Sequence, residues 1–63
     1  MQVRVQDGEV IVSLNRADDI RLFDLTGRLC GSAVQTGEAR FTVPAAGIYI
    51  VRTSGDVRKV NVQ

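Results

Sequence analysis

The chain has 63 residues, eight of them basic and seven acidic, with no histidine and one cysteine. A chain of this length makes one domain, and basic residues scattered along it at a net charge of +1 do not predict a nucleic-acid surface. One cysteine excludes an internal disulfide, and the missing histidine removes the commonest metal ligand and general base, so no cofactor is predicted.

The first two strands are predicted to form a hairpin. Val3 and Val5 alternate with polar residues over positions 2–6, and the Asp7-Gly8 pair that follows is the strongest short signal for a two-residue β-turn. The strands on either side of this turn are therefore expected to pair with each other.

A second strand is predicted over residues 9–14, with a loop after it. Ile11 lies alone on one face of this segment, and the opposite face holds Val10, Val12 and Leu14. Residues 15–19 are polar and break the alternation. An Asp could cap a short helix here, but no periodic apolar segment follows, so a loop is the favoured interpretation.

A second hairpin is the clearest feature of the chain. Residues 20–25 alternate as a strand, and residues 28–34 return as the next one, where small side chains predict close packing. Between them, Asp24 suits the first position of a type I turn, where its carboxylate accepts a backbone N–H. Gly27 suits the positive φ that closes such a loop as a G1-type bulge.

Three further strands are predicted, over residues 39–43, 48–53 and 57–62, with turns at 35–38, 44–47 and 54–56. Gly47 frees the chain to enter the sixth strand after Pro44 has ended the fifth. The sixth strand is apolar on both faces over residues 48–51, which favours a central or doubly covered position. On the last strand, Val60 and Val62 are expected to face away from Arg58, Lys59 and Asn61.

Seven short strands separated by turns predict an all-β fold, namely a small antiparallel β-sandwich of about seven strands that is immunoglobulin-like in architecture and occupies residues 1–63 as one domain. A small open barrel is the alternative. The Cys…Trp…Cys core of immunoglobulin domains is absent, so the likeness is one of architecture. Such a sheet has edge strands, and pairing through the first or the last strand predicts a weak homodimer.

No residue pattern predicts catalysis, and we expect that the chain is not an enzyme. Asp18 and Asp19 could be taken as a carboxylate pair, but without histidine and in a polar loop they are interpreted as solvated residues. Cys30 is interpreted as a small hydrophobic residue of the core rather than a surface thiol. Tyr49 offers an apolar body with a hydroxyl that can reach a backbone group or water.

Three motifs occur in order along the chain. Residues 22–29 read Leu-Phe-Asp-Leu-Thr-Gly-Arg-Leu, residues 43–52 read Val-Pro-Ala-Ala-Gly-Ile-Tyr-Ile-Val-Arg, and Lys59-Val60 lies near the end. Together they resemble the C-terminal sorting domain of type IX secretion (Por secretion) substrates in Bacteroidota. The pattern of that family is an aromatic-Asp-x-x-Gly-Arg hairpin, a Gly-x-Tyr-x-Val-Arg strand and a basic-apolar final strand, and the likeness covers nearly the whole chain.

The resemblance implies a β-sandwich that follows an exported cargo domain and is read by the outer-membrane secretion translocon and its sorting machinery. Such a protein crosses the periplasm in transit and ends at the cell surface or outside the cell. The chain is then expected to be the C-terminal domain of a longer exported protein, since it begins without an export signal or cargo. The motif and sorting residues that the resemblance implies are Asp24, Gly27, Arg28, Gly47, Tyr49, Val51, Arg52, Arg58, Lys59 and Val60.

The alternative function is that of a non-catalytic β-sandwich interaction module, such as an adhesin or a carbohydrate-binding appendage. A sugar site needs exposed aromatic rings, and the chain offers only Phe23, Phe41 and Tyr49, at least two of them on core-facing alternations. Sorting is therefore the preferred hypothesis, with its determinants expected in the final strand, residues 57–63.

Overall fold

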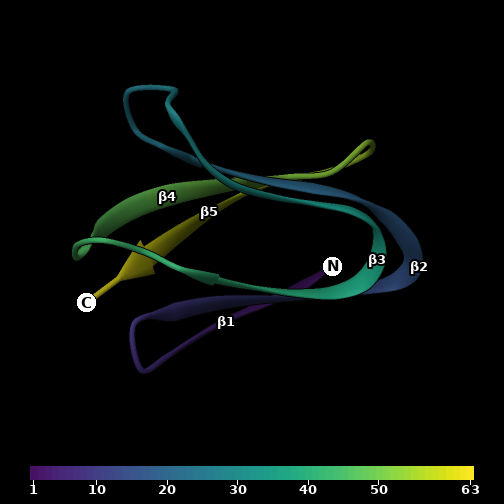
Figure 1. Cartoon of the computed structure of the whole chain (residues 1–63), viewed down its shortest axis with the longest axis horizontal. Coiled ribbons are helices and arrows are strands. Elements are labelled where there is room, and N and C mark those ends of the chain that lie inside the picture. Colours follow the sequence, from purple (N-terminus) through teal and green to yellow (C-terminus); the bar gives the residue numbers. More distant parts are fainter.

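The computed structural model describes all 63 residues as five antiparallel strands without a helix (Figure 1). They are β1 (Gln2–Gln6), β2 (Glu9–Asp24), β3 (Leu29–Thr42), β4 (Gly47–Arg52) and β5 (Val57–Val62). The predicted all-β antiparallel class is confirmed, but the predicted number of strands is wrong. Two pairs of expected strands are in fact single long strands, because β2 includes residues 15–19 and β3 includes residues 35–38.

β2 organises the sheet. β3 pairs with β2 along most of its length, while on the other side β1 pairs with the first part of β2 and β4 pairs with its last part. β5 pairs with β4 alone among the strands. Figure 1 shows that β2 and β3 turn over together at one end of the molecule, so the sheet curls into a half-barrel.

The curl divides the sheet into two layers. The first layer contains β1, residues 9–13 of β2 and residues 38–42 of β3. The second layer contains residues 29–36 of β3, residues 18–24 of β2, β4 and β5. β1 is an edge strand of the first layer and β5 an edge strand of the second. These two edges approach each other but do not form a ladder.

The bend between the layers explains why the predicted loops are strands. The pairing register of β2 and β3 shifts on both sides of Asp18, and Gln35 takes a positive φ of 47°. Asp18 accepts hydrogen bonds from the hydroxyl and N–H of Ser54 at 2.6 and 3.3 Å, and Asp19 accepts two from Gln35. Asp19 thus takes up a β3 N–H beside the irregular pairing, and Asp18 ties the bend to the connection between β4 and β5, so the strands bend without ending.

The first hairpin forms as predicted. Asp7 and Gly8 have φ values of 52° and 75°, and two positive values in succession characterise a type I′ turn. β1 pairs with β2 without a register shift from Gln2 opposite Ser13 to Gln6 opposite Glu9.

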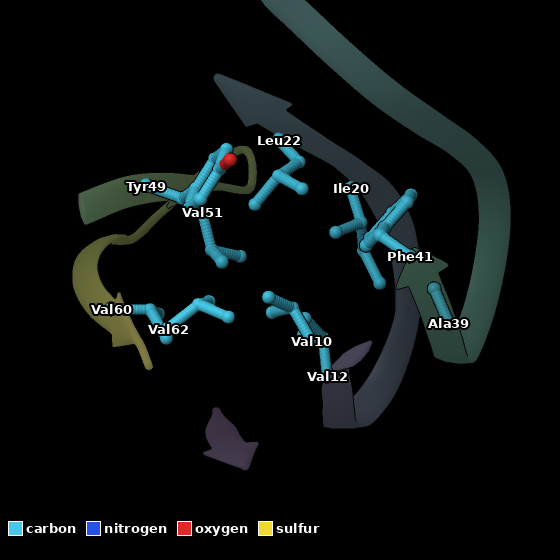
Figure 2. Close-up of a cluster of buried hydrophobic side chains, with 10 residues drawn as sticks. All are labelled: Val10, Val12, Ile20, Leu22, Ala39, Phe41, Tyr49, Val51, Val60 and Val62. Atoms are coloured by element: carbon cyan, nitrogen blue, oxygen red, sulfur yellow. The ribbon is translucent and has the colours of Figure 1, made fainter. Parts of the chain in front are cut away.

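The core lies between the two layers and is entirely apolar apart from one tyrosine hydroxyl. Its ten side chains point toward one another in Figure 2: Val10, Val12, Ile20, Leu22, Ala39, Phe41, Tyr49, Val51, Val60 and Val62. Cys30 is partly buried and packs against this cluster, as predicted for a small hydrophobic residue. Leu14 also packs against it, on the face expected from the alternation.

Ile11 is buried on the opposite, outer face of the first layer, where only 1% of it is exposed. Its direct neighbours across the sheet are Arg4 on β1 and Arg40 on β3. Long arginine side chains cover apolar surface with their alkyl stems while their charged ends reach water. The first layer therefore presents a polar outer surface despite this buried isoleucine.

Candidate recognition surface

The first motif builds a closed turn between β2 and β3. The Oδ1 atom of Asp24 accepts three hydrogen bonds, from the N–H and hydroxyl of Thr26 at 2.9 and 2.6 Å and from the N–H of Arg28 at 3.0 Å. Gly27 has a φ of 87°, and its N–H donates to the backbone carbonyl of Asp24. The N–H of Asp24 donates to the backbone carbonyl of Arg28, so Gly27 is the positive-φ residue of the predicted turn and its G1-type bulge, and both are confirmed. A separate register shift between Leu22 and Phe23 leaves Cys30 without a cross-strand partner.

The hydrogen bonds to this turn also set its electrostatics. The pKa of Asp24 is lowered, mainly by the hydrogen bond from the Thr26 hydroxyl. The N–H groups of Arg28 and Thr26 and the charge of Arg28 lower it further, while burial acts in the opposite direction. The Ser54 hydroxyl and the N–H of Asp19 lower the pKa of Asp18 in the same way. Both carboxylates are thus stabilised as anions and engaged as structural acceptors.

The second motif places Tyr49 in the core. Its side chain is 5% exposed, and its hydroxyl donates a hydrogen bond of 2.7 Å to the carbonyl oxygen of Ala45. The tyrosine therefore anchors the connection from β3 to β4, which agrees with the expected apolar body and backbone-bound hydroxyl. Gly47 begins β4 with a φ of 153°, a conformation that favours glycine, and Val51 is fully buried.

The third motif lies on β5, directly beside the second. Tyr49 is opposite Val60, Ile50 is opposite Lys59, and Val51 is opposite Arg58. Val60 and Val62 are buried, whereas Arg58 and Lys59 are exposed. Strand alternation puts Arg58 on the same side as Val60, at the margin of the sheet, so the prediction that it faces away from Val60 is wrong.

The three motifs, which are distant in the sequence, therefore meet in the second layer. Asp24 is opposite Tyr49, and Tyr49 is opposite Val60, so one cross-strand row joins the motifs. The predicted sorting residues fall into two groups. Turn or core positions hold Asp24, Gly27, Gly47, Tyr49, Val51 and Val60, while exposed basic positions hold Arg28, Arg52, Arg58 and Lys59.

Sequence reasoning missed the outer face of this second layer, which we call the basic apolar face. It contains Arg21, Phe23, Ile50, Arg52, Val57 and Lys59. β4 is central, between β2 and β5, as predicted, but it is not covered on both sides, because Ile50 is only half-buried and Ile48 is 38% exposed. The apolar run 48–51 was the available signal, but it fits a central strand and a doubly covered strand equally, and the structure shows the central one.

No group of three or more His, Cys, Asp or Glu side chains gathers where it could hold a metal ion. No helix of the structure is long and apolar enough to cross a membrane.

Comparison with known proteins gives no relative. No protein-family model, no curated protein and no solved structure matches this chain.

Proposed function

We propose that this chain is a C-terminal sorting domain that directs an exported cargo through the type IX secretion system. The observation that supports the proposal best is the convergence of the three motifs on β2, β4 and β5, in adjacent positions of one layer. Residues that one receptor binds at the same time must lie close together on the surface. None of the predicted sorting residues belongs to the first layer. The proposed partners are the outer-membrane translocon and its sorting machinery, and the proposed route is through the periplasm to the cell surface or beyond.

The half-barrel is compatible with the sandwich that the proposal requires. The seven segments expected of an immunoglobulin-like sandwich correspond to the three short strands and the two halves of each long strand. A bend replaces a loop at two places, and the two layers still enclose one core. On this proposal, the five-strand half-barrel is a seven-segment sandwich in which two pairs of consecutive segments are continuous strands.

The proposed recognition element is β5, held in place by β4. β5 anchors itself through buried Val60 and Val62 while Arg58 and Lys59 remain exposed. Within the chain β5 has one ladder partner, so its second edge can accept a strand from a receptor. The alternative carbohydrate module receives less support, because Phe41 and Tyr49 are buried in the core and Phe23 is the one aromatic ring left at the surface.

The test is a secretion assay in which exposed residues of β5 are substituted. Deleting residues 57–63 would be less informative, because the deletion also removes side chains of the core. The domain is fused behind a reporter exported to the periplasm in a bacterium with type IX secretion. Surface delivery of the parent fusion is expected, with retention in the periplasm for Arg58→Glu and Lys59→Glu. Arg4→Glu makes the same charge change on the first layer and is the matched control. Periplasmic retention of the parent fusion contradicts the sorting function, and delivery of both β5 variants contradicts its placement on β5.

A further inference from the structure

The basic apolar face brings several partly or fully exposed apolar side chains close together. Phe23 and Ile50 lie opposite each other and are half-buried, and the neighbouring Leu29 and Val57 are 52% and 61% exposed. Together with Gly27 and Arg52, three of these residues line a shallow depression: Phe23, Ile50 and Val57. A concave apolar site of this kind receives a side chain from a partner.

The basic side chains of the same face form no ion pair. Arg21 is directly opposite Arg52 in the pairing of β2 with β4, and Lys59 is opposite Ile50 on the next strand. Like charges directly opposite each other across a sheet destabilise it. The one ion pair of the structure lies elsewhere, between Arg40 and Glu9 on the first layer, at 3.6 Å. An unrelieved arginine pair beside an apolar depression indicates a ligand with negative charge.

From these two observations we propose that the basic apolar face binds a protein segment that presents an apolar side chain flanked by carboxylates. The apolar side chain of the segment occupies the depression. Its carboxylates pair with Arg52, which lines the depression, and with Arg21 and Lys59 on the neighbouring strands. Arginine pairs with carboxylates in a bidentate geometry, which adds specificity to the charge attraction. The interaction concerns this face only and does not require the sorting function.

A second copy of the chain does not satisfy this chemistry. Two basic apolar faces packed against each other would bring arginines and lysines together, and like charges across an interface cost affinity. The first layer of a neighbouring copy offers Glu9 and Glu38, but Glu9 already pairs with Arg40, and Arg4 lies on the same face. An anionic lipid surface fits less well than a protein segment, because insertion into lipid requires apolar side chains that protrude, and the apolar residues here line a depression.

The test uses isotope-labelled domain and two defined peptides. The first carries a central Leu-Val-Leu flanked by glutamates, and the second has lysines in place of the glutamates. The acidic peptide is expected to shift the NMR signals of Phe23, Ile50, Arg52 and Val57. Its affinity should fall several-fold between about 0.05 and about 0.5 M salt, because screening weakens exposed charge pairs.

Variants then locate the binding surface. Arg52→Glu should weaken binding by about tenfold or more. Val57→Ser should weaken it without altering the charge, and Arg4→Glu, on the opposite layer, should leave it unchanged. Equal binding of the lysine peptide, signal shifts on the first layer, or no shift at millimolar peptide overturns the proposal. So does binding to phosphatidylglycerol vesicles in place of the peptide. Because the assay contains no secretion machinery, the face and the sorting function can each fail alone.

Discussion

The ring of Phe41 packs against Gly31 so closely that a Cβ atom on Gly31 would lie 2.6 Å from Cδ1 of the phenylalanine. Both residues belong to β3, which turns over between them and brings its two halves onto one core. Gly31 is opposite Leu22, and Phe41 is opposite Val10. The missing side chain of Gly31 thus makes room for the ring that closes the far side of the core.

Gly31→Ala is expected to destabilise the protein by about 1–3 kcal/mol, because overpacking forces a ring or a strand to move. For a domain of this size each kcal/mol corresponds to a fall in Tm of roughly 4–8 °C. Thermal unfolding followed by circular dichroism measures the effect. Gly55→Ala is the matched control, because its Cβ would meet no atom within 4 Å and the glycine has no positive φ. An unchanged Tm for Gly31→Ala would show that the contact is not made.

Gly27→Val is expected to destabilise the β2–β3 turn by a different mechanism. A Cβ at Gly27 would touch nothing within 4 Å, so its cost arises from the backbone, which holds a φ of 87°. A side chain at positive φ costs on the order of 1 kcal/mol, and a β-branched one costs more. Gly27→Asn should cost less, because asparagine tolerates this region. Equal Tm values for the parent, the Asn variant and the Val variant would contradict the turn.

Acid is expected to weaken the turn and the bend together. Hydrogen-bond donors lower the pKa of Asp24 and of Asp18 in the folded protein. The folded state therefore binds fewer protons, so this stabilisation is complete above the ordinary pKa of aspartate, about 3.9, and is lost as the pH falls through the lower folded-state pKa. Tm should fall in that acid range, and Asp24→Asn should reduce the fall. An identical acid response of the variant and the parent in a pH series of melts would refute the assignment.

The features that sequence predicts well here are those that depend on adjacent residues. The two turns are set by Asp7-Gly8 and by the spacing of Asp24 and Gly27, and the structure confirms both. The chemistry of such turns is local, so it does not depend on the rest of the fold.

The features that sequence did not predict depend on residues far apart in the chain. Asp18 and Asp19 are typical loop residues, yet they lie within a strand because Ser54 and Gln35 supply the donors for their carboxylates. The outward position of Ile50 could not be distinguished from a buried one, because an apolar residue on a central strand can face either a second layer or solvent. The motif residues could be named from the sequence, but their convergence in one layer follows only from the pairing of β2, β4 and β5.

Edge pairing through β1 is expected to produce a weak dimer at high micromolar concentration. β1 is a regular strand that pairs with β2 alone, without bulges, and Val5 is 40% exposed. β5 approaches its other edge without forming a ladder, so the backbone groups of that edge are left unpaired. β3 also has an open edge, but the positive φ of Gln35 interrupts it. On β5, Val60 and Val62 are buried in the core, so that edge offers less apolar contact. Two β1 strands related by a two-fold axis would join two sheets through reciprocal backbone hydrogen bonds.

Sedimentation velocity over a range of concentrations measures this association. Val5→Lys should abolish the dimer, because a charged side chain on an edge strand opposes the approach of a second sheet. Val57→Lys introduces the same residue at an exposed valine of β5, away from the β1 edge, and should leave the dimer intact. A protein that sediments only as a monomer at high micromolar concentration rules out edge pairing. A dimer that survives Val5→Lys but not Val57→Lys would place the contact on the basic apolar face.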